Sequence, residues 1–250
     1  MEGIVVFALD FVGSPKIPQE KYLVHYKLTA LDITTYYSRP GPQCSLLNQN
    51  PDLTYNCVMR TYRAVNLNVL WFLIGLNVVI FIITLIRPET VINRLGLTPA
   101  LLPRQPWTII TSMFVHNPRI WTHILFNMIS LYFLGSFVIR AAGEKSFLVV
   151  FIIGGLMGNV LYFLVGPPFT PGIGASGGVF ALGGALAVMV PRVPVIVFPI
   201  PVPISLWVAI LIFLLLSFLP GIAWQAHIGG LVLGLAAGFI FRRRRRTYYF

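Results

Sequence analysis

Long apolar segments separated by short polar connections make up most of the chain after about residue 60. A helix needs about 20 apolar residues to cross a bilayer. The pattern predicts six crossings, at about residues 66–86, 121–139, 147–165, 174–190, within 195–219, and 224–241. Because the number of crossings is even, we expect both ends of this membrane core on the same side.

The connection between the first and second crossings, residues 87–120, is long and interrupted by prolines. Its apolar patches, 95–102 and 107–115, are too short to span a bilayer and fit helices that lie in the interface or pack beside the bundle, with Trp107 at headgroup level. The predicted fold class is therefore an all-α membrane protein, a six-transmembrane-helix bundle with a long, partly helical, interface-embedded connection between its first two spans.

Residues 1–58 differ from the rest of the chain. They hold five of the seven acidic residues and show no sustained helical or alternating period. We expect at most weak local structure in this N-terminal extension and a membrane domain over residues 59–250. As a hypothesis, the extension is not part of the native protein, and a peptide from it detected by mass spectrometry in native material would refute this. Both cysteines, Cys44 and Cys57, lie here, and their pairing stays open.

Composition agrees with a multi-pass membrane protein, because 57% of the residues are hydrophobic, 10% are charged and the mean hydropathy is +0.82. The net charge of +11 does not point to nucleic acid, since five of the eighteen positive residues form the block 242–246 directly after the last apolar segment. If this block is cytoplasmic, ten positive residues lie inside and four outside, which follows the positive-inside tendency. We therefore expect an integral protein of the cell membrane whose core termini are both cytoplasmic.

Polar residues recur at one depth of the predicted bundle. The second span opens with His123 and Asn127, which share a helix face, and His116 lies just before it. The fourth span begins near Ser176, and the sixth opens with His227. All lie toward the outer side in the expected orientation. Polar groups inside a membrane usually face a cavity in the bundle, so we expect a functional site that opens to the outer side.

Small residues predict how the fourth and sixth spans meet. Two faces at helical spacing are His227, Gly230, Gly234 and Gly238 in the sixth span, and Ser176, Phe180, Gly183 and Ala187 in the fourth. Small residues let two helices approach closely. Packing these faces together would bring the imidazole of His227 within hydrogen-bond reach, about 2.6–3.2 Å, of the Ser176 hydroxyl.

A serine and a histidine in contact can act as nucleophile and base. No acidic residue is available as a third member, because every Asp precedes the first span and Glu89 and Glu144 lie elsewhere. No His-Glu-x-x-His pattern or pair of membrane aspartates exists, so we expect neither a metal site nor a cofactor. The backbone N–H of Ser176, the Asn127 amide and the His123 ring could stabilise an oxyanion, or the last two could serve as interhelical hydrogen bonds.

Three motifs within about residues 60–241 are similar to those of a known protein family. They are His-Ile-Leu-Phe-Asn at 123–127, Gly-Ala-Ser-Gly at 174–177 and Ala-His-Ile-Gly-Gly at 226–230, on the second, fourth and sixth spans. Together they resemble the rhomboid intramembrane serine proteases. One departure concerns the outer connection, where this chain has Trp107-Thr108 and the family often has Trp-Arg.

The resemblance assigns roles to residues of this chain. It implies that Ser176 is the nucleophile and His227 the general base, and that His123, Asn127 and the Ser176 amide stabilise the oxyanion. It implies supporting roles for the residues around them, with Gly174 in the serine motif, Phe180 against the His227 ring and His116 near the water-access cavity.

The expected function is an endopeptidase that cleaves transmembrane segments of other membrane proteins near the outer face of the bilayer, with the fifth span as a lateral gate. The alternative is a catalytically silent, rhomboid-like chaperone or client-binding protein, which we would expect to lack the Ser or the His. A transporter would predict internal repeats, which the chain does not show. The substrates and the oligomeric state stay open.

Overall fold

The computed structural model describes residues 6–7, 22–27, 43–46, 54–59, 66–197 and 202–247, with side chains from residue 66 to residue 242. The chain divides into two units, Met1–Val12 with Val65–Phe250, and Gly13–Ala64. The second unit contains β2 (Tyr22–Lys27), β3 (Gln43–Leu46) and β4 (Thr54–Met59), an antiparallel sheet in the order β2-β4-β3. Its register places Cys44 opposite Cys57. The sequence predicts weak local structure for 1–58, and the described parts of that segment show short strands. The hypothesis that residues 1–58 are not part of the native protein stays open.

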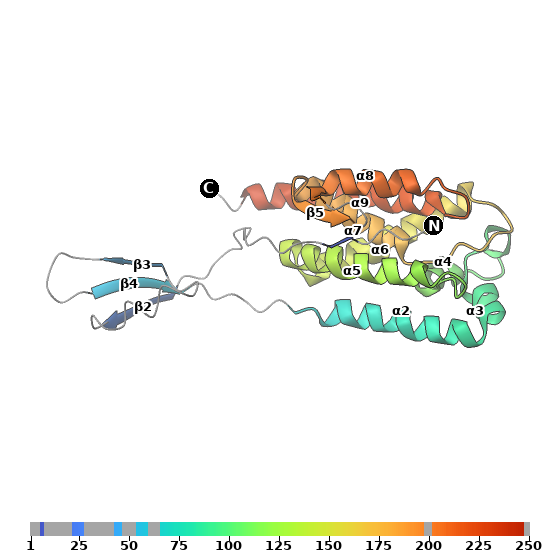
Figure 1. The fold of residues 1–250 in the computed structure, drawn as a ribbon, viewed down its shortest axis with the longest axis horizontal. Coiled ribbons are helices and arrows are strands. Elements are labelled where there is room, and N and C mark those ends of the chain that lie inside the picture. The colour runs from blue at the N-terminus through green and yellow to red at the C-terminus, as the bar shows by residue number, and fades with distance from the viewer. Residues whose placement is uncertain are drawn as a thin grey trace. The chain divides into compact units, whose positions relative to one another are not determined.

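The first unit is a bundle of helices (Figure 1). Its helices and short 3-10 turns are α2 (Asn68–Ile86), α3 (Pro88–Leu95), η1 (Pro99–Leu101), α4 (Thr108–Thr111), η2 (Ser112–Phe114), α5 (Trp121–Ala142), α6 (Glu144–Val165), α7 (Ser176–Met189), α8 (Leu206–Leu216) and α9 (Trp224–Thr247). Its strands are β1 (Val6–Phe7), β5 (Pro194–Val197) and β6 (Ile204–Ser205), and β5 pairs antiparallel with both β1 and β6.

Four helices in the described part of the chain, α2, α5, α6 and α9, are long and apolar enough to cross a membrane. The helices α7 and α8 are apolar but shorter. Large apolar side chains on the outside of the bundle are widely exposed, with Phe72 at 68% and Leu164 at 67%. Such a surface suits lipid rather than water. The sequence predicts six crossings of the membrane, and the crossings by α7 and α8 stay a prediction.

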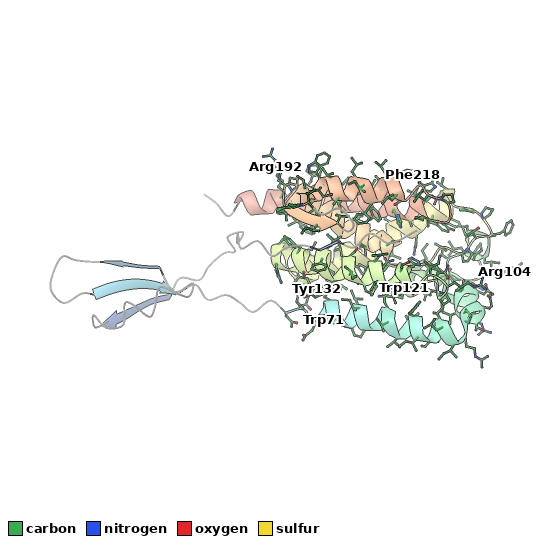
Figure 2. The ribbon with its side chains drawn as sticks, viewed as in Figure 1. Trp71, Arg104, Trp121, Tyr132, Arg192 and Phe218 are labelled. Carbon is green, nitrogen blue, oxygen red and sulfur yellow. The ribbon has the colours of Figure 1, made fainter. Side chains whose placement is uncertain are left out.

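The helix α2 lies at the edge of the bundle beside α5 (Figure 1). Trp71 on α2 contacts Tyr132 on α5, with ring centroids 5.3 Å apart (Figure 2). In contrast, α7 lies at the centre, where eleven of its fourteen residues are buried. The neighbours of α7 therefore fix the helix, and Ser176 is half-buried at its N-terminus.

Small residues let α9 lie directly against the backbone of α7. Added Cβ atoms at Gly230, Gly234 and Gly238 would meet the backbone of Gly177, Ala181 and Ala185. The predicted face of α9 is thus confirmed. The predicted face of α7 meets α9 only at its N-terminal end, where Ser176 and Phe180 contact His227, because Gly183 lies against Ile210 of α8. Small residues of α7 occur on every side of the helix. Their spacing alone therefore did not determine which of them would pack against α9.

The connection after α2 is partly helical, and hydrogen bonds hold its helices to one another and to α6. The Trp107 indole donates to the Arg94 carbonyl at 2.8 Å, and the Thr111 hydroxyl to the Leu95 carbonyl at 2.8 Å. Asn159 of α6 donates to the carbonyl of Ile109 at 2.7 Å. The Trp107 indole therefore ties the start of α4 to the end of α3 within the connection.

The connection also holds the loop that leads into α7. Leu97 and Gly172 exchange backbone hydrogen bonds of 3.0 and 2.8 Å, and the Gly174 N–H donates to the Ser112 carbonyl at 2.9 Å. Because Gly174 lies two residues before the serine, the connection fixes where the serine loop begins.

The described residues at the start of the fifth apolar segment form strands rather than a helix. In the described parts of the predicted span within 195–219, the end of β5 and then β6 precede α8, which begins at Leu206. Prolines cannot donate to a helical ladder, and Pro201 and Pro203 together with β-branched residues disfavour a helix before that point. The helix α8 is therefore 11 residues long.

Candidate active site

The structure brings the hydroxyl of Ser176 into contact with the ring of His227. Ser176 is the first residue of α7, and His227 lies in the first turn of α9. The distance between Ser176 Oγ and His227 Nε2 is 2.8 Å, and the histidine is 8% exposed. A nucleophile and a general base need this distance, because the proton must pass directly between them. The close packing of α7 on α9 positions both groups.

An aromatic ring sets the plane of the imidazole. Phe180 lies one turn after Ser176, and its ring stacks on His227 with centroids 4.4 Å apart and an interplanar angle of 19°. The contact agrees with the place expected for Phe180. Stacked rings resist tilting, so the base keeps one edge toward the serine.

His123 lies on the other side of the serine loop. Gly174 has a φ of +124°, and a Cβ there would lie 2.7 Å from His123 Nε2 and 3.8 Å from Ser176 Oγ. The Asn117 N–H donates to His123 Nδ1 at 3.4 Å. Because Nδ1 accepts, a neutral ring carries its hydrogen on Nε2, the nitrogen that faces the serine loop. His123 can therefore donate toward a negative charge that develops near Ser176.

Asn127 lines the same cavity as Ser176. Its side-chain N–H group donates to the His123 carbonyl at 2.8 Å, and its Oδ1 is buried without a hydrogen-bond partner among the described residues. An amide nitrogen has two hydrogens, so one remains for a ligand. The bond to His123 lies within α5, so among the described residues it is not the interhelical hydrogen bond weighed from the sequence, and the second N–H is left for a bound group.

His116 lies behind His123 and is fully buried. The two imidazole centroids are 5.0 Å apart in an edge-to-face arrangement, and neither ring nitrogen of His116 has a hydrogen-bond partner in the described part of the chain. Burial, and then the neighbouring His123, lower the pKa of His116 to about 3. The ring is therefore neutral at ordinary pH. Its expected place near the water path stays a prediction.

A cavity of about 140 Å³ adjoins the serine. Three helices line it, with Phe126, Asn127, Ser130 and Leu134 from α5, Ser176, Val179 and Phe180 from α7, and Leu206, Ala209, Ile210 and Phe213 from α8. Most of these side chains are apolar. The cavity suits an apolar or small group placed beside the hydroxyl.

One polar residue of the site was missed by the sequence analysis. Ser217, at the C-terminal end of α8, lies with its Oγ 2.7 Å from His227 Nδ1. A carboxylate was the expected third member, and Ser217, a serine between two apolar spans, belongs to no motif. To predict this contact from the sequence, one would have to know that the end of α8 lies beside the start of α9.

The structure thus defines a class of protein, a helical membrane bundle with a serine and a histidine in contact inside it. The Rhomboid domain model matches residues 103–244, more than half of the chain. The chain therefore belongs to the rhomboid family, and it is an integral membrane protein.

Individual relatives support this assignment. The chain is 26% identical over 193 residues to Rhomboid protein 1, mitochondrial, of Saccharomyces cerevisiae, covering 69% of this chain and 53% of the relative. It is 34% identical over 160 residues to RHOMBOID-like protein 12, mitochondrial, of Arabidopsis thaliana, covering 55% and 47%. It is 32% identical over 192 residues to Rhomboid protease GlpG of Salmonella typhi, covering 72% and 66%. The chain thus spans about half to two thirds of the length of these relatives.

Proposed function

We propose that this protein is an intramembrane serine endopeptidase that cleaves transmembrane segments of other membrane proteins. The observation that carries the proposal is the 2.8 Å contact between His227 Nε2 and Ser176 Oγ, among helices of membrane-spanning length and composition. Membership of the rhomboid family supports it.

In this mechanism His227 Nε2 takes the hydroxyl proton while Ser176 Oγ attacks the carbonyl carbon of the scissile peptide bond. The protonated ring then gives that proton to the leaving amine, and the carbon–nitrogen bond breaks to leave an acyl ester on Ser176. A water molecule, deprotonated by the same nitrogen, then attacks the ester carbon, and the bond to Oγ breaks as Nε2 returns the proton to Oγ, which releases the acid and the free serine.

Three donors are proposed for the negative oxygen of the tetrahedral intermediate. The backbone N–H of Ser176 is in the first turn of α7, where N–H groups lack partners within the helix. The His123 Nε2–H faces the same loop, and the Asn127 amide lies in the wall of the cavity. Loss of one such donor lowers kcat by about 100- to 1000-fold.

The cavity between α5, α7 and α8 is the proposed place for substrate residues near the scissile bond. A helical peptide bond is shielded by its own turn, so a substrate must unwind there, which favours small or helix-breaking residues. The short α8 is the proposed gate, because it forms one wall and supplies no nucleophile, base or oxyanion donor. With Cys44 and Cys57 replaced by serine, an engineered disulfide between α5 and α8 should block cleavage; unchanged cleavage would refute the gate.

We also propose that α7 and α8 cross the membrane, which makes six crossings, in a protease domain of residues 59–250. At about 1.5 Å per residue, α7 is about 21 Å long, shorter than a bilayer core of about 30 Å, but the other helices surround it. Arg104 and Arg192 lie at opposite ends of the bundle (Figure 2), as an odd number of crossings between them requires. The proposed location is the cell membrane, with cytoplasmic core termini and the site opening outward. Accessibility of a C-terminal tag from outside intact cells would contradict this orientation.

The test is cleavage of a single-span model substrate in liposomes. Wild-type protein should cut it, and Ser176→Ala and His227→Ala should abolish the products. Ser136→Ala is the matched control, because this buried serine of α5 only donates within its own helix, to the Phe133 carbonyl at 3.0 Å. If wild-type protein binds the substrate without cutting it, the proposal fails in favour of a client-binding protein.

A further inference from the structure

His227 has a second polar contact, which the proposed reaction does not use. Its Nδ1 lies 2.7 Å from the Oγ of Ser217, the residue that follows the last turn of α8. Ser217 is 2% exposed and His227 is 8% exposed, so bulk water does not compete for this contact. Both ring nitrogens of the base are therefore held by hydroxyl groups, one on each edge.

A second hydrogen bond of Ser217 decides the direction of this contact. Ser217 Oγ is 2.8 Å from the carbonyl oxygen of Phe213, one turn earlier. A carbonyl oxygen can only accept, so the single hydroxyl hydrogen of Ser217 is donated to Phe213. The hydrogen between Ser217 and His227 must then belong to the ring, and His227 Nδ1 donates.

This direction also determines what the other nitrogen can do. A neutral imidazole with its hydrogen on Nδ1 has a lone pair on Nε2. That lone pair points at the Ser176 hydroxyl, as a general base requires. A chain of hydrogen bonds runs from Ser176 to His227, then to Ser217, and ends at the Phe213 carbonyl. Each hydrogen in the chain is donated to the next group. With the opposite tautomer, the lone pair of Nδ1 would face the Ser217 oxygen, whose hydrogen is donated to Phe213, and Nε2 could only donate to Ser176.

We propose that Ser217 is a positioning residue, which holds His227 in the tautomer and orientation that let it accept the proton of Ser176. The inference deepens the proposed protease function and rests on it. Phe180 fixes the plane of the ring from its face, and Ser217 fixes the rotation within that plane from its edge. A hydroxyl performs here the orienting task of a carboxylate without placing a charge inside the bundle.

Kinetics of three variants test the role. Ser217→Ala removes the acceptor, and Ser217→Cys keeps nearly the same volume with a much weaker acceptor. Both should lower kcat by roughly 10- to 100-fold, the range that follows from leaving one buried donor without a partner. The KM should stay within about twofold, because Ser217 does not line the cavity. Ser217→Thr, which keeps the hydroxyl, should restore most of the rate.

A spectroscopic measurement separates this inference from the proposed function. Nitrogen-15 NMR of histidine-labelled protein in liposomes reports which ring nitrogen carries the hydrogen, and His227→Ala identifies the signal. The wild-type ring should be protonated on Nδ1, and Ser217→Ala and Ser217→Cys should shift it toward Nε2. This readout does not require cleavage, so an inactive wild type would refute the function and still test Ser217.

Ser136→Ala is the matched control, since it also removes a buried hydroxyl that donates to a carbonyl of its own helix. It should keep both the wild-type rate and the wild-type tautomer. The inference is overturned if the Ser217 variants that fold keep the Nδ1-protonated ring or the wild-type kcat. It is equally overturned if Ser217→Thr leaves the rate as low as Ser217→Ala, because the loss then reflects packing.

Discussion

Replacing Gly230 by alanine tests whether the close approach of α7 and α9 sets the distance between nucleophile and base. A Cβ atom on Gly230 would lie well inside van der Waals contact with the Gly177 carbonyl. Neither group can rotate away, because one is backbone and the other is attached directly to it, so the two helices must separate. Overpacking of this kind destabilises a core by about 1–3 kcal/mol.

The same separation reaches the active site. Gly230 follows His227 by one turn on α9, and Gly177 follows Ser176 directly on α7. The present distance from Nε2 to Oγ is 2.8 Å. A hydrogen bond weakens beyond about 3.2 Å, and a misplacement of about 1 Å lowers a catalytic rate by about 100-fold. We therefore expect Gly230→Ala to lower kcat by about that factor and to lower the thermal stability.

The assay compares kcat for the single-span substrate in liposomes with the midpoint of thermal unfolding in detergent. Gly75→Ala is the matched control, since among the described residues no atom outside its own helix lies within 4 Å of a Cβ added at that position of α2. It should keep the wild-type rate and lose no stability, because alanine favours a helix over glycine by about 1 kcal/mol. A wild-type rate for Gly230→Ala, or an equal loss in both variants, would refute the reasoning.

Other predictions concern the surroundings of the site. Phe180→Ala should reduce cleavage by roughly 10-fold whereas Phe180→Tyr retains it, because tyrosine keeps the stack on His227; equal rates for the two variants would contradict this. Gly174→Ala should lower both stability and cleavage, since it places a Cβ 2.7 Å from His123 Nε2 at a φ of +124°; a wild-type melting midpoint would speak against it. The folded state depresses the pKa of His116 from 6.5 to about 3, so its contribution to stability is complete above pH 6.5 and is lost as the pH falls toward 3. At about pH 5 the loss is about 2 kcal/mol, and thermal unfolding of His116→Phe should depend correspondingly less on pH; identical pH dependence would exclude this burial effect.

Sequence reasoning located the long helices because a crossing needs a continuous apolar run. The predicted span at 147–165 appears as α6, which begins three residues earlier at Glu144. An acidic residue in the first turn favours that start through the helix dipole. Such bounds depend on local chemistry, which a sequence shows directly.

The prolines before α8 show the limit of hydropathy. The segment is apolar enough to continue a helix, yet β5 and β6 occupy its beginning. Hydropathy measures preference for lipid or a core and is the same for a strand and a helix. The prolines obscured the helix start in the sequence, but they did not predict that the strands pair.

Contacts between helices were predictable only in part. The approach of His227 to Ser176 is observed, since both lie at helix ends that the motifs mark, while their catalytic roles remain proposals. The contact from Ser217 depends on where α8 ends relative to α9. No spacing within one helix encodes that relation, and the residue is neither acidic nor part of a motif.

Covalent labelling tests the central claim most directly, that His227 activates Ser176 inside the bundle. Reconstituted protein would be treated with a fluorophosphonate, which reacts with activated serines, and the adduct located by peptide mass spectrometry. The account predicts an adduct on Ser176 that is lost in His227→Ala and persists in Ser136→Ala. An adduct on another residue, or labelling of Ser176 at the same rate without His227, would contradict it.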